Sequence, residues 1–209
     1  MEFRRDISFE LEQRLREPRS FIQIVLGPRQ TGKTTAIRQA LKETGLPDHV
    51  FSADSPQAIS PEQLEVEWMQ ARALAQQGPA VLFIDEIQKA SGWSETVKRL
   101  WDEDSWDELD LKVVLSGSSS LLLSAGVSES LMGRHEVIRS THWDLSEMSR
   151  AFGYALDDYL MFGGYPGAAR LKDNAKRWKD YMRDSIIEAT ISKDILQMER
   201  VRKSALMRA

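Results

Sequence analysis

The sequence predicts an α/β fold with a five-stranded parallel sheet, followed by a helical region, on the strength of three observations. Residues 21–26 form a short apolar run that leads into a glycine-containing loop and then a helical stretch. Residues 80–84 form an unbroken apolar run, which is typical of a parallel strand that helices cover on both faces. Strand and helix patterns alternate up to about residue 142, and only helical patterns follow.

The composition predicts a globular protein and excludes several kinds of site. The chain has 209 residues, with 42% hydrophobic and 29% charged residues, which is enough for one core and a small appendage. It contains no cysteine, which rules out disulfides and cysteine-based zinc sites and is compatible with a cytoplasmic location. The net charge of −4 gives no general case for nucleic-acid binding. No apolar run approaches the about 20 residues that a membrane helix needs, so we expect no membrane partner.

A short amphipathic helix over residues 7–17 is the first predicted element, and Pro18 ends it before the first strand. It is interpreted as a packing helix, or as a segment near the nucleotide base. The first strand leads directly into residues 27–34, Gly-Pro-Arg-Gln-Thr-Gly-Lys-Thr, which fit the phosphate-binding pattern G-x-x-x-x-G-K-[ST] (Walker A) of P-loop NTPases. A chance match is expected in roughly one chain in a hundred of this length, and the strand before it and the helix after it lower that chance further.

Each part of this loop has a chemical role in nucleotide binding. Gly27 and Gly32 allow a tight bend that turns backbone N–H groups inward. Lys33 can reach the β- and γ-phosphates, and the Thr34 hydroxyl can bind Mg²⁺. The positive end of the helix that begins near Lys33 also favours a phosphate. The predicted nucleotide-binding residues are Gly27, Pro28, Arg29, Gln30, Thr31, Gly32, Lys33, Thr34 and Thr35.

A second strand is expected at residues 49–53, and a helix begins after Ser60. Ser60 can cap this helix, Pro61 suits its first turn, and Gln63 can complete a capping box. The third strand then ends in Asp85 and Glu86, about 50 residues after the loop. Asp85 is interpreted as the Walker B acid that holds Mg²⁺, directly or through water, and Glu86 as the acceptor of a proton from the attacking water. A solvated Asp-Glu turn is the alternative. The second acid favours a hydrolase over a kinase.

A helix with an apolar stripe follows at residues 93–101, and an acidic run at residues 102–108 is expected to be its solvated end. The fourth strand covers residues 111–115 and leads into Ser116, which could contact the γ-phosphate or belong to a helix-capping turn. The fifth strand covers residues 135–139. Arg134, just before it, is a candidate arginine finger, acting in cis or from a neighbouring subunit, or else a surface residue.

Helical patterns fill the remainder of the chain. One helix face is expected at Leu145, Met148 and Phe152, a break at residues 163–167, and a long, moderately basic helix after it. The basic face is expected to be solvated, with a nucleic-acid patch as the alternative. The end of the chain carries no helix-stop signal and is interpreted as a truncation. We therefore divide the chain into an N-terminal helix at 1–18, a P-loop core at 19–142, and a helical region with the start of a missing part at 143–209.

The motifs together resemble the predicted bacterial and archaeal ATPases of the AAA+ superfamily whose P-loop domain precedes a poorly characterised C-terminal domain. The matching stretches are residues 27–35, 82–93, 115–119, 129–134 and 162–168. The resemblance implies a sheet order of 5-1-4-3-2 and a helical lid. It assigns the sensor role to Ser116, although the family usually has threonine there, and a phosphate-sensing role to Arg134. It places residues 163–166 near the nucleotide, and it implies that the full protein is longer.

The sequence thus predicts an ATPase that uses Mg²⁺ and couples hydrolysis to movement of the lid or of a partner. The predicted catalytic residues are Lys33, Glu86, Ser116 and Arg134, and the predicted metal ligands are Thr34 and Asp85. The preference for ATP rests on the resemblance. A switch or scaffold that binds ATP with negligible turnover, acting through a partner or DNA, is the alternative. A homo-oligomer is possible, and any protein or nucleic-acid partner is unidentified. A GTPase is disfavoured because the chain has no Asn-Lys-x-Asp motif.

Overall fold

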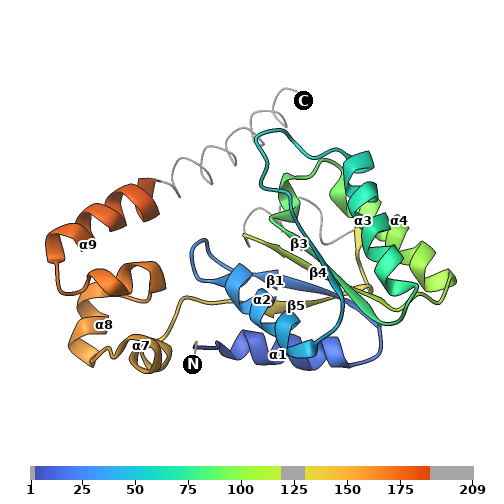
Figure 1. Cartoon of the computed structure of the whole chain (residues 1–209). Coiled ribbons are helices and arrows are strands. Elements are labelled where there is room, and N and C mark those ends of the chain that lie inside the picture. The colour runs from blue at the N-terminus through green and yellow to red at the C-terminus, as the bar shows by residue number, and fades with distance from the viewer. Residues whose placement is uncertain (1–2, 119–129, 189–209) are drawn as a thin grey trace. The chain divides into compact units, whose positions relative to one another are not determined.

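The computed structural model describes residues 3–118 and 130–188, and the chain divides into two compact units (Figure 1). The first unit contains the chain up to Pro28 together with Lys33–Ser140. The second contains Arg29–Gly32 together with the chain from Thr141 onward. The helix that the capping alternative for Ser116 implies, and the part of the last predicted helix beyond residue 188, lie outside the described residues.

The first unit is built on a parallel sheet of five strands in the order β2-β3-β4-β1-β5, which confirms the predicted fold and strand order. Read in the opposite direction, this is the order 5-1-4-3-2. The strands are β1 (Ile22–Leu26), β2 (Asp48–Ser52), β3 (Ala80–Asp85), β4 (Leu111–Gly117) and β5 (His135–Arg139). Every residue of β1 and β4 is buried, as expected for strands that helices cover on both faces.

Helices cover both faces of this sheet, as Figure 1 shows. On one face pack α1 (Asp6–Arg16) and α2 (Lys33–Thr44), which bury Leu11, Leu15 and Ile37 against the sheet. On the other face pack α3 (Pro61–Ala75) and α4 (Trp93–Trp106), with the short 3₁₀ helix η1 (Ile87–Lys89) following β3. Full burial of each large apolar side chain contributes roughly 1.5–3 kcal/mol, so these contacts dominate the stability of the unit.

The local signals around α3 hold in the structure. The Ser60 Oγ accepts a hydrogen bond from the Gln63 N–H at 3.3 Å, and the Gln63 Oε1 accepts one from the Ser60 N–H at 2.9 Å. This reciprocal capping box satisfies two backbone donors at the start of the helix. The apolar face of α3 is buried, and its members are Leu64, Trp68, Ala71 and Ala75.

The acidic run at the end of α4 is not simply a solvated helix end, because one of its carboxylates is buried in the fold. Asp104 is only 1% exposed, and it accepts hydrogen bonds from the Trp68 Nε1 at 2.8 Å and the Arg72 Nε at 2.5 Å. Burial raises the pKa of Asp104, and these two donors oppose that shift. Asp102 is paired with Arg134. The expectation of a solvated end is therefore wrong for Asp104, whereas Asp102 stays partly exposed.

In the part of the second unit that the structure describes, all regular secondary structure is helical. The helices are α7 (Leu145–Phe152), α8 (Leu156–Phe162), the 3₁₀ helix η2 (Pro166–Leu171), α9 (Ala175–Tyr181) and the π-helical η3 (Met182–Ile187). Asp144 and Glu147 form a second capping box at the start of α7. The long helix expected at this end is α9, whose hydrogen-bonding pattern changes after Tyr181 to the wider π turn of η3. Among the described residues, no helix combines the length and the apolarity needed to cross a membrane.

Candidate nucleotide site

With the exception of Arg134, the predicted site residues of the first unit gather at one edge of the sheet. Because all five strands are parallel, their carboxyl ends meet at the same edge, which is where open α/β sheets bind their ligands. The phosphate-binding loop follows β1, Asp85 ends β3, and Ser116 is the second-last residue of β4. The order β3-β4-β1 makes these three strands neighbours in the sheet.

The beginning of the loop requires glycine for a steric reason that the sequence did not reveal. A Cβ atom on Gly27 would lie 2.1 Å from the backbone oxygen of Ser140, which is far too close for any side chain. The chain after β5 passes here because the Ser140 N–H donates to the Leu26 oxygen at 2.6 Å. Gly27 thus allows the close approach of two backbone segments at the start of the loop.

Lys33 is the first residue of α2 and is buried, with 7% of its surface exposed. Its ammonium group donates to the carbonyl oxygens of Gly27 at 2.9 Å and Pro28 at 2.7 Å. The side chain therefore folds back across the loop, and its charge is held at the N-terminal end of α2. The charge and the helix end both favour a bound anion.

Asp85 is the point at which two hydroxyl groups from different elements meet. The Thr34 Oγ1, from the first turn of α2, donates to the Asp85 Oδ2 at 2.8 Å. The Ser116 Oγ, from β4, donates to the other oxygen, Asp85 Oδ1. The structure thus brings together three residues that are separated in sequence by 51 and 31 positions. The side chain predicted to sense the γ-phosphate here contacts the predicted metal ligand.

The donor set at Asp85 fits Mg²⁺. A hydroxyl oxygen and a carboxylate oxygen 2.8 Å apart are both hard ligands, which Mg²⁺ prefers. Mg²⁺ is commonly held by one or two protein oxygens, with water and substrate phosphates completing its octahedron. The described residues contain no cluster of three or more His, Cys, Asp or Glu side chains that could hold a metal by themselves. A metal here would accordingly depend on the phosphates of a nucleotide.

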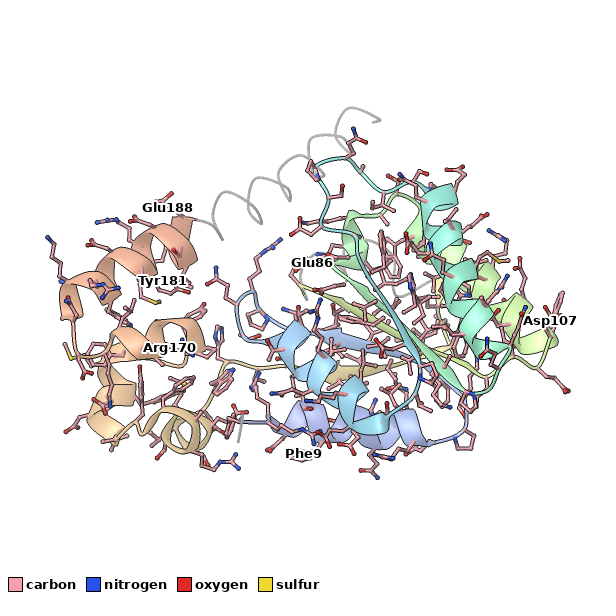
Figure 2. The ribbon with its side chains drawn as sticks, viewed as in Figure 1. Phe9, Glu86, Asp107, Arg170, Tyr181 and Glu188 are labelled. Atoms are coloured by element: carbon pink, nitrogen blue, oxygen red, sulfur yellow. The ribbon has the colours of Figure 1, made fainter. Side chains whose placement is uncertain are left out.

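Glu86 directly follows β3 (Figure 2). Its backbone conformation is unusual, with φ of 53° and ψ of 41°. This left-handed conformation is strained for a residue that is not glycine, and such strain concentrates at functional sites. The Glu86 Oε2 accepts a hydrogen bond from the Gln88 Nε2 at 2.5 Å, and the Glu86 N–H donates to the Asp85 Oδ1 at 3.1 Å. Backbone geometry and Gln88 together fix the direction of the carboxylate that was predicted to act on water.

The middle of the loop, Arg29–Gly32, belongs to the second compact unit and has its own partners there. The Trp143 Nε1 donates to the Thr31 oxygen at 2.9 Å, and the Gln30 Nε2 donates to the Ser185 oxygen at 2.7 Å. Gln30 and Gly32 have positive φ angles of 60° and 83°. Gly32 therefore fits its left-handed position without strain, whereas Gln30 does not. Thr35, in the first turn of α2, is exposed.

The structure does not bring Arg134 to the edge that carries Lys33 and Asp85. Arg134 immediately precedes β5, and its oxygen accepts a hydrogen bond from the N–H of Ile22, the first residue of β1. It therefore lies at the amino ends of the strands. Its Nε and Nη2 donate to the two carboxylate oxygens of Asp102 at 2.7 and 2.9 Å, and this bond raises the pKa of the guanidinium. A role of Arg134 in trans stays a prediction, whereas a role in its own protomer does not suit this position.

Sequence reasoning missed three side chains near the loop and the strand ends. Gln88 was missed because a contact between residues two apart in a turn leaves no periodic signal. Trp143 lies 112 positions from its partner Thr31, so no local pattern could reveal it. Ser118, just after β4, is 3% exposed, and its hydroxyl has no hydrogen-bond partner among the described residues. A serine-rich strand end was the only signal for it.

The fold and this edge of the sheet define a P-loop domain of the AAA type. A model of the AAA domain family matches residues 19–149, which is more than half of the chain, and a model of a domain of unknown function (DUF8612) matches residues 153–209. The chain belongs to the AAA domain family, as the sequence resemblance indicated. ATP binding and hydrolysis are the activities that this family implies.

Three relatives of the chain are described as uncharacterized proteins. The chain is 24% identical over 201 residues to the uncharacterized protein MJ1544 of Methanocaldococcus jannaschii, covering 87% of this chain and 43% of that protein. It is 27% identical over 197 residues to the uncharacterized proteins Mb2031c of Mycobacterium bovis and Rv2008c of Mycobacterium tuberculosis, covering 93% of this chain and 40% of each. The chain thus spans about two fifths of the length of these relatives.

Proposed function

We propose that the chain binds ATP with Mg²⁺ through its phosphate-binding loop and hydrolyses it. The observation that carries this proposal is that Thr34 and Ser116 both donate hydrogen bonds to the Asp85 carboxylate. Thr34 directly follows Lys33 in the chain. Each of these residue types performs a known task in phosphoryl transfer, and they stand at the strand ends where such ligands bind.

Each site residue has a separate role in this proposal. Lys33 and the loop N–H groups neutralise the β- and γ-phosphates, and Lys33 exchanges its loop carbonyls for phosphate oxygens when it does so. Glu86, held by Gln88, orients a water molecule and accepts its proton. Thr34 and Asp85 would hold the metal, with Ser116 fixing the carboxylate from the opposite side. When bound there, Mg²⁺ would neutralise charge on the phosphates.

We expect ATP affinity to depend on Mg²⁺ through Asp85. Chelation of Mg²⁺ should weaken ATP binding by wild-type protein about tenfold, because the carboxylate then has no bridge to the phosphates. In Asp85→Asn the same chelation should change affinity less than about threefold. Calorimetric titration of ATP with Mg²⁺ and with EDTA measures both effects. Asp48→Asn, which changes a carboxylate at the start of β2, is the control and should behave as wild type. An equal Mg²⁺ effect in Asp85→Asn would contradict this assignment.

We further propose that Arg134 acts on the nucleotide of a neighbouring copy in a homo-oligomer. Its position at the amino ends of the strands supports action in trans, and its guanidinium is presented on a partly exposed surface with Asp102 as its partner. In this arrangement each protomer binds ATP alone but hydrolyses it slowly until a neighbour supplies the charge.

Arg134→Ala is expected to lower turnover on the order of 10³-fold, as for other arginine fingers, while ATP affinity stays unchanged. Asp102→Asn is the matched control, since it breaks the same ion pair but keeps the arginine. Loss of this partly exposed pair should change stability by at most about 1 kcal/mol in either variant. Phosphate release measured at one protein concentration compares the three proteins. Equal activity of Arg134→Ala and wild type would exclude the role.

A switch that binds ATP with negligible turnover is the second candidate. Two contacts favour it, because each engages a predicted catalytic group in a bond within the protein. The Glu86 carboxylate accepts a hydrogen bond from Gln88, and the Arg134 guanidinium is paired with Asp102. Under this candidate, wild-type protein would bind Mg-ATP but release no phosphate at any protein concentration. The role of the protein would then lie in the partner or movement that nucleotide binding controls.

A further inference from the structure

We propose that Trp143 is a positioning residue for the phosphate-binding loop, and that Gly164 is the residue that allows it to take this position. The inference rests on the proposed nucleotide binding for its functional consequence, but its geometric part stands on contacts within the second compact unit alone. It assigns a role to the Gly-Gly-Tyr-Pro-Gly break at residues 163–167.

The side chain of Trp143 donates a hydrogen bond to the loop. The indole Nε1 is the side chain's single donor, and it donates to the Thr31 oxygen at 2.9 Å. Trp143 is 7% exposed and Thr31 is fully buried, so water does not compete for this bond. A Cβ built on Gly32 would contact the same indole ring at 4.0 Å, so the ring lies along the Thr31–Gly32 peptide.

This bond fixes the direction of a donor that the phosphate needs. In a trans peptide the carbonyl oxygen and the following N–H point in opposite directions. Holding the Thr31 oxygen on Trp143 therefore turns the Gly32 N–H to the other side of the peptide plane. Gly32 accepts the left-handed backbone that this orientation requires, with φ of 83°. Without the indole donor, rotation of this peptide would leave the loop with one misdirected N–H.

Trp143 is itself held by residues of α7 and α8 and packs closely against the glycine break that follows them. The Tyr159 hydroxyl donates to the Trp143 oxygen at 2.9 Å, and the Phe152 ring lies 5.5 Å from the Trp143 ring, centroid to centroid. A Cβ on Gly164 would lie 2.1 Å from the Trp143 oxygen and 3.1 Å from its carbonyl carbon. These are backbone atoms that cannot rotate away. Gly164 is therefore required for space, and any side chain there would displace Trp143.

A tryptophan that merely fills the core of the helical unit would make no hydrogen bond to the loop. The same unit offers a matched control in Trp178, whose ring packs edge-on against Phe162 at 5.3 Å. The buried Nε1 of Trp178 has no hydrogen-bond partner within the described residues. Phe in place of either tryptophan removes the N–H and part of the ring. Only Trp143→Phe removes a bond to the loop.

The first measurement is hydrogen–deuterium exchange of the peptide that contains residues 27–35, in the full chain without nucleotide. Trp143→Phe should raise exchange in this peptide at least about fivefold, whereas Trp178→Phe should leave it as in wild type. Gly164→Ala should act like Trp143→Phe. Gly167→Ala is its control, because its Cβ would meet the hydroxyl end of the Tyr181 side chain instead. Unchanged exchange in Trp143→Phe would overturn the inference whether or not the protein binds nucleotide.

The second measurement is calorimetric titration with Mg-ADP. Trp143→Phe should bind Mg-ADP about five- to tenfold more weakly than wild type, while Trp178→Phe stays within about twofold, at comparable losses of thermal stability. Equal affinities of the two variants would overturn the functional part of the inference. Failure of wild-type protein to bind Mg-ADP would instead count against the proposed function, and the exchange experiment would still decide the role of Trp143.

Discussion

Glu86→Gln is expected to lower Mg-ATP turnover by at least about 100-fold, since general base catalysis typically contributes 10²- to 10⁴-fold. The amide has the same shape as the carboxylate but cannot accept a proton from water. It can still accept the hydrogen bond that the Gln88 Nε2 donates to Oε2, so the local structure should be kept. ATP affinity should remain within about threefold of wild type, which would trap the nucleotide on the protein.

Phosphate release and equilibrium binding of ATP measure the two halves of this expectation. Glu65→Gln is a suitable control, because Glu65 is a carboxylate of α3 whose partner is Arg99 on α4. Turnover in Glu86→Gln at more than about a tenth of the wild-type rate would remove Glu86 from the catalytic role. A simultaneous loss of ATP binding would indicate that the substitution disturbs the neighbouring Asp85, whose Oδ1 accepts the Glu86 N–H.

Lys33→Ala is expected to weaken Mg-ATP binding at least tenfold, and by about 2–3 kcal/mol if its ammonium makes a full charge-assisted bond to the phosphates. The ammonium lies at the start of the loop, within 2.9 Å of the oxygens of Gly27 and Pro28. Its removal also leaves those two carbonyls without this donor, so the loop should become less ordered.

Lys42→Ala gives the matched control for this variant, because Lys42 lies in the last turn of the same helix and is exposed. Titration of ATP into each variant, with thermal unfolding to show that α2 still folds, separates binding from stability. Unchanged Mg-ATP affinity in Lys33→Ala would refute nucleotide binding through this loop, and with it the whole proposed function.

The fold was predictable because its signals are local. The apolar runs that became β1 and β3 and the capping box at Ser60 all lie within a few consecutive residues. The motif after β1 also located Lys33 and Thr34, and the strand end located Asp85 and Glu86. In these places the residues that define the strand end and the helix start also carry the phosphate-binding chemistry, since a phosphate site needs both.

The parts that were missed depend on contacts between distant segments. No spacing in the sequence pairs Trp143 with Thr31, or Trp68 with Asp104. Asp104 was interpreted as a solvated acid because charged runs usually are, and tertiary packing buried it instead. Arg134 was identified from its sequence position, but a residue just before a strand of a parallel sheet lies at the amino ends of the strands, opposite the loop, and the contact of its oxygen with the Ile22 N–H bears this out.

The central claim is tested most directly by Mg-ATP turnover per protomer as a function of protein concentration. We expect turnover that rises with concentration and is absent in Glu86→Gln, because we propose that Arg134 of a neighbouring copy completes the site at Asp85. Near-zero turnover at every concentration, from wild-type protein that nevertheless binds Mg-ATP, would contradict hydrolysis and leave the switch as the function.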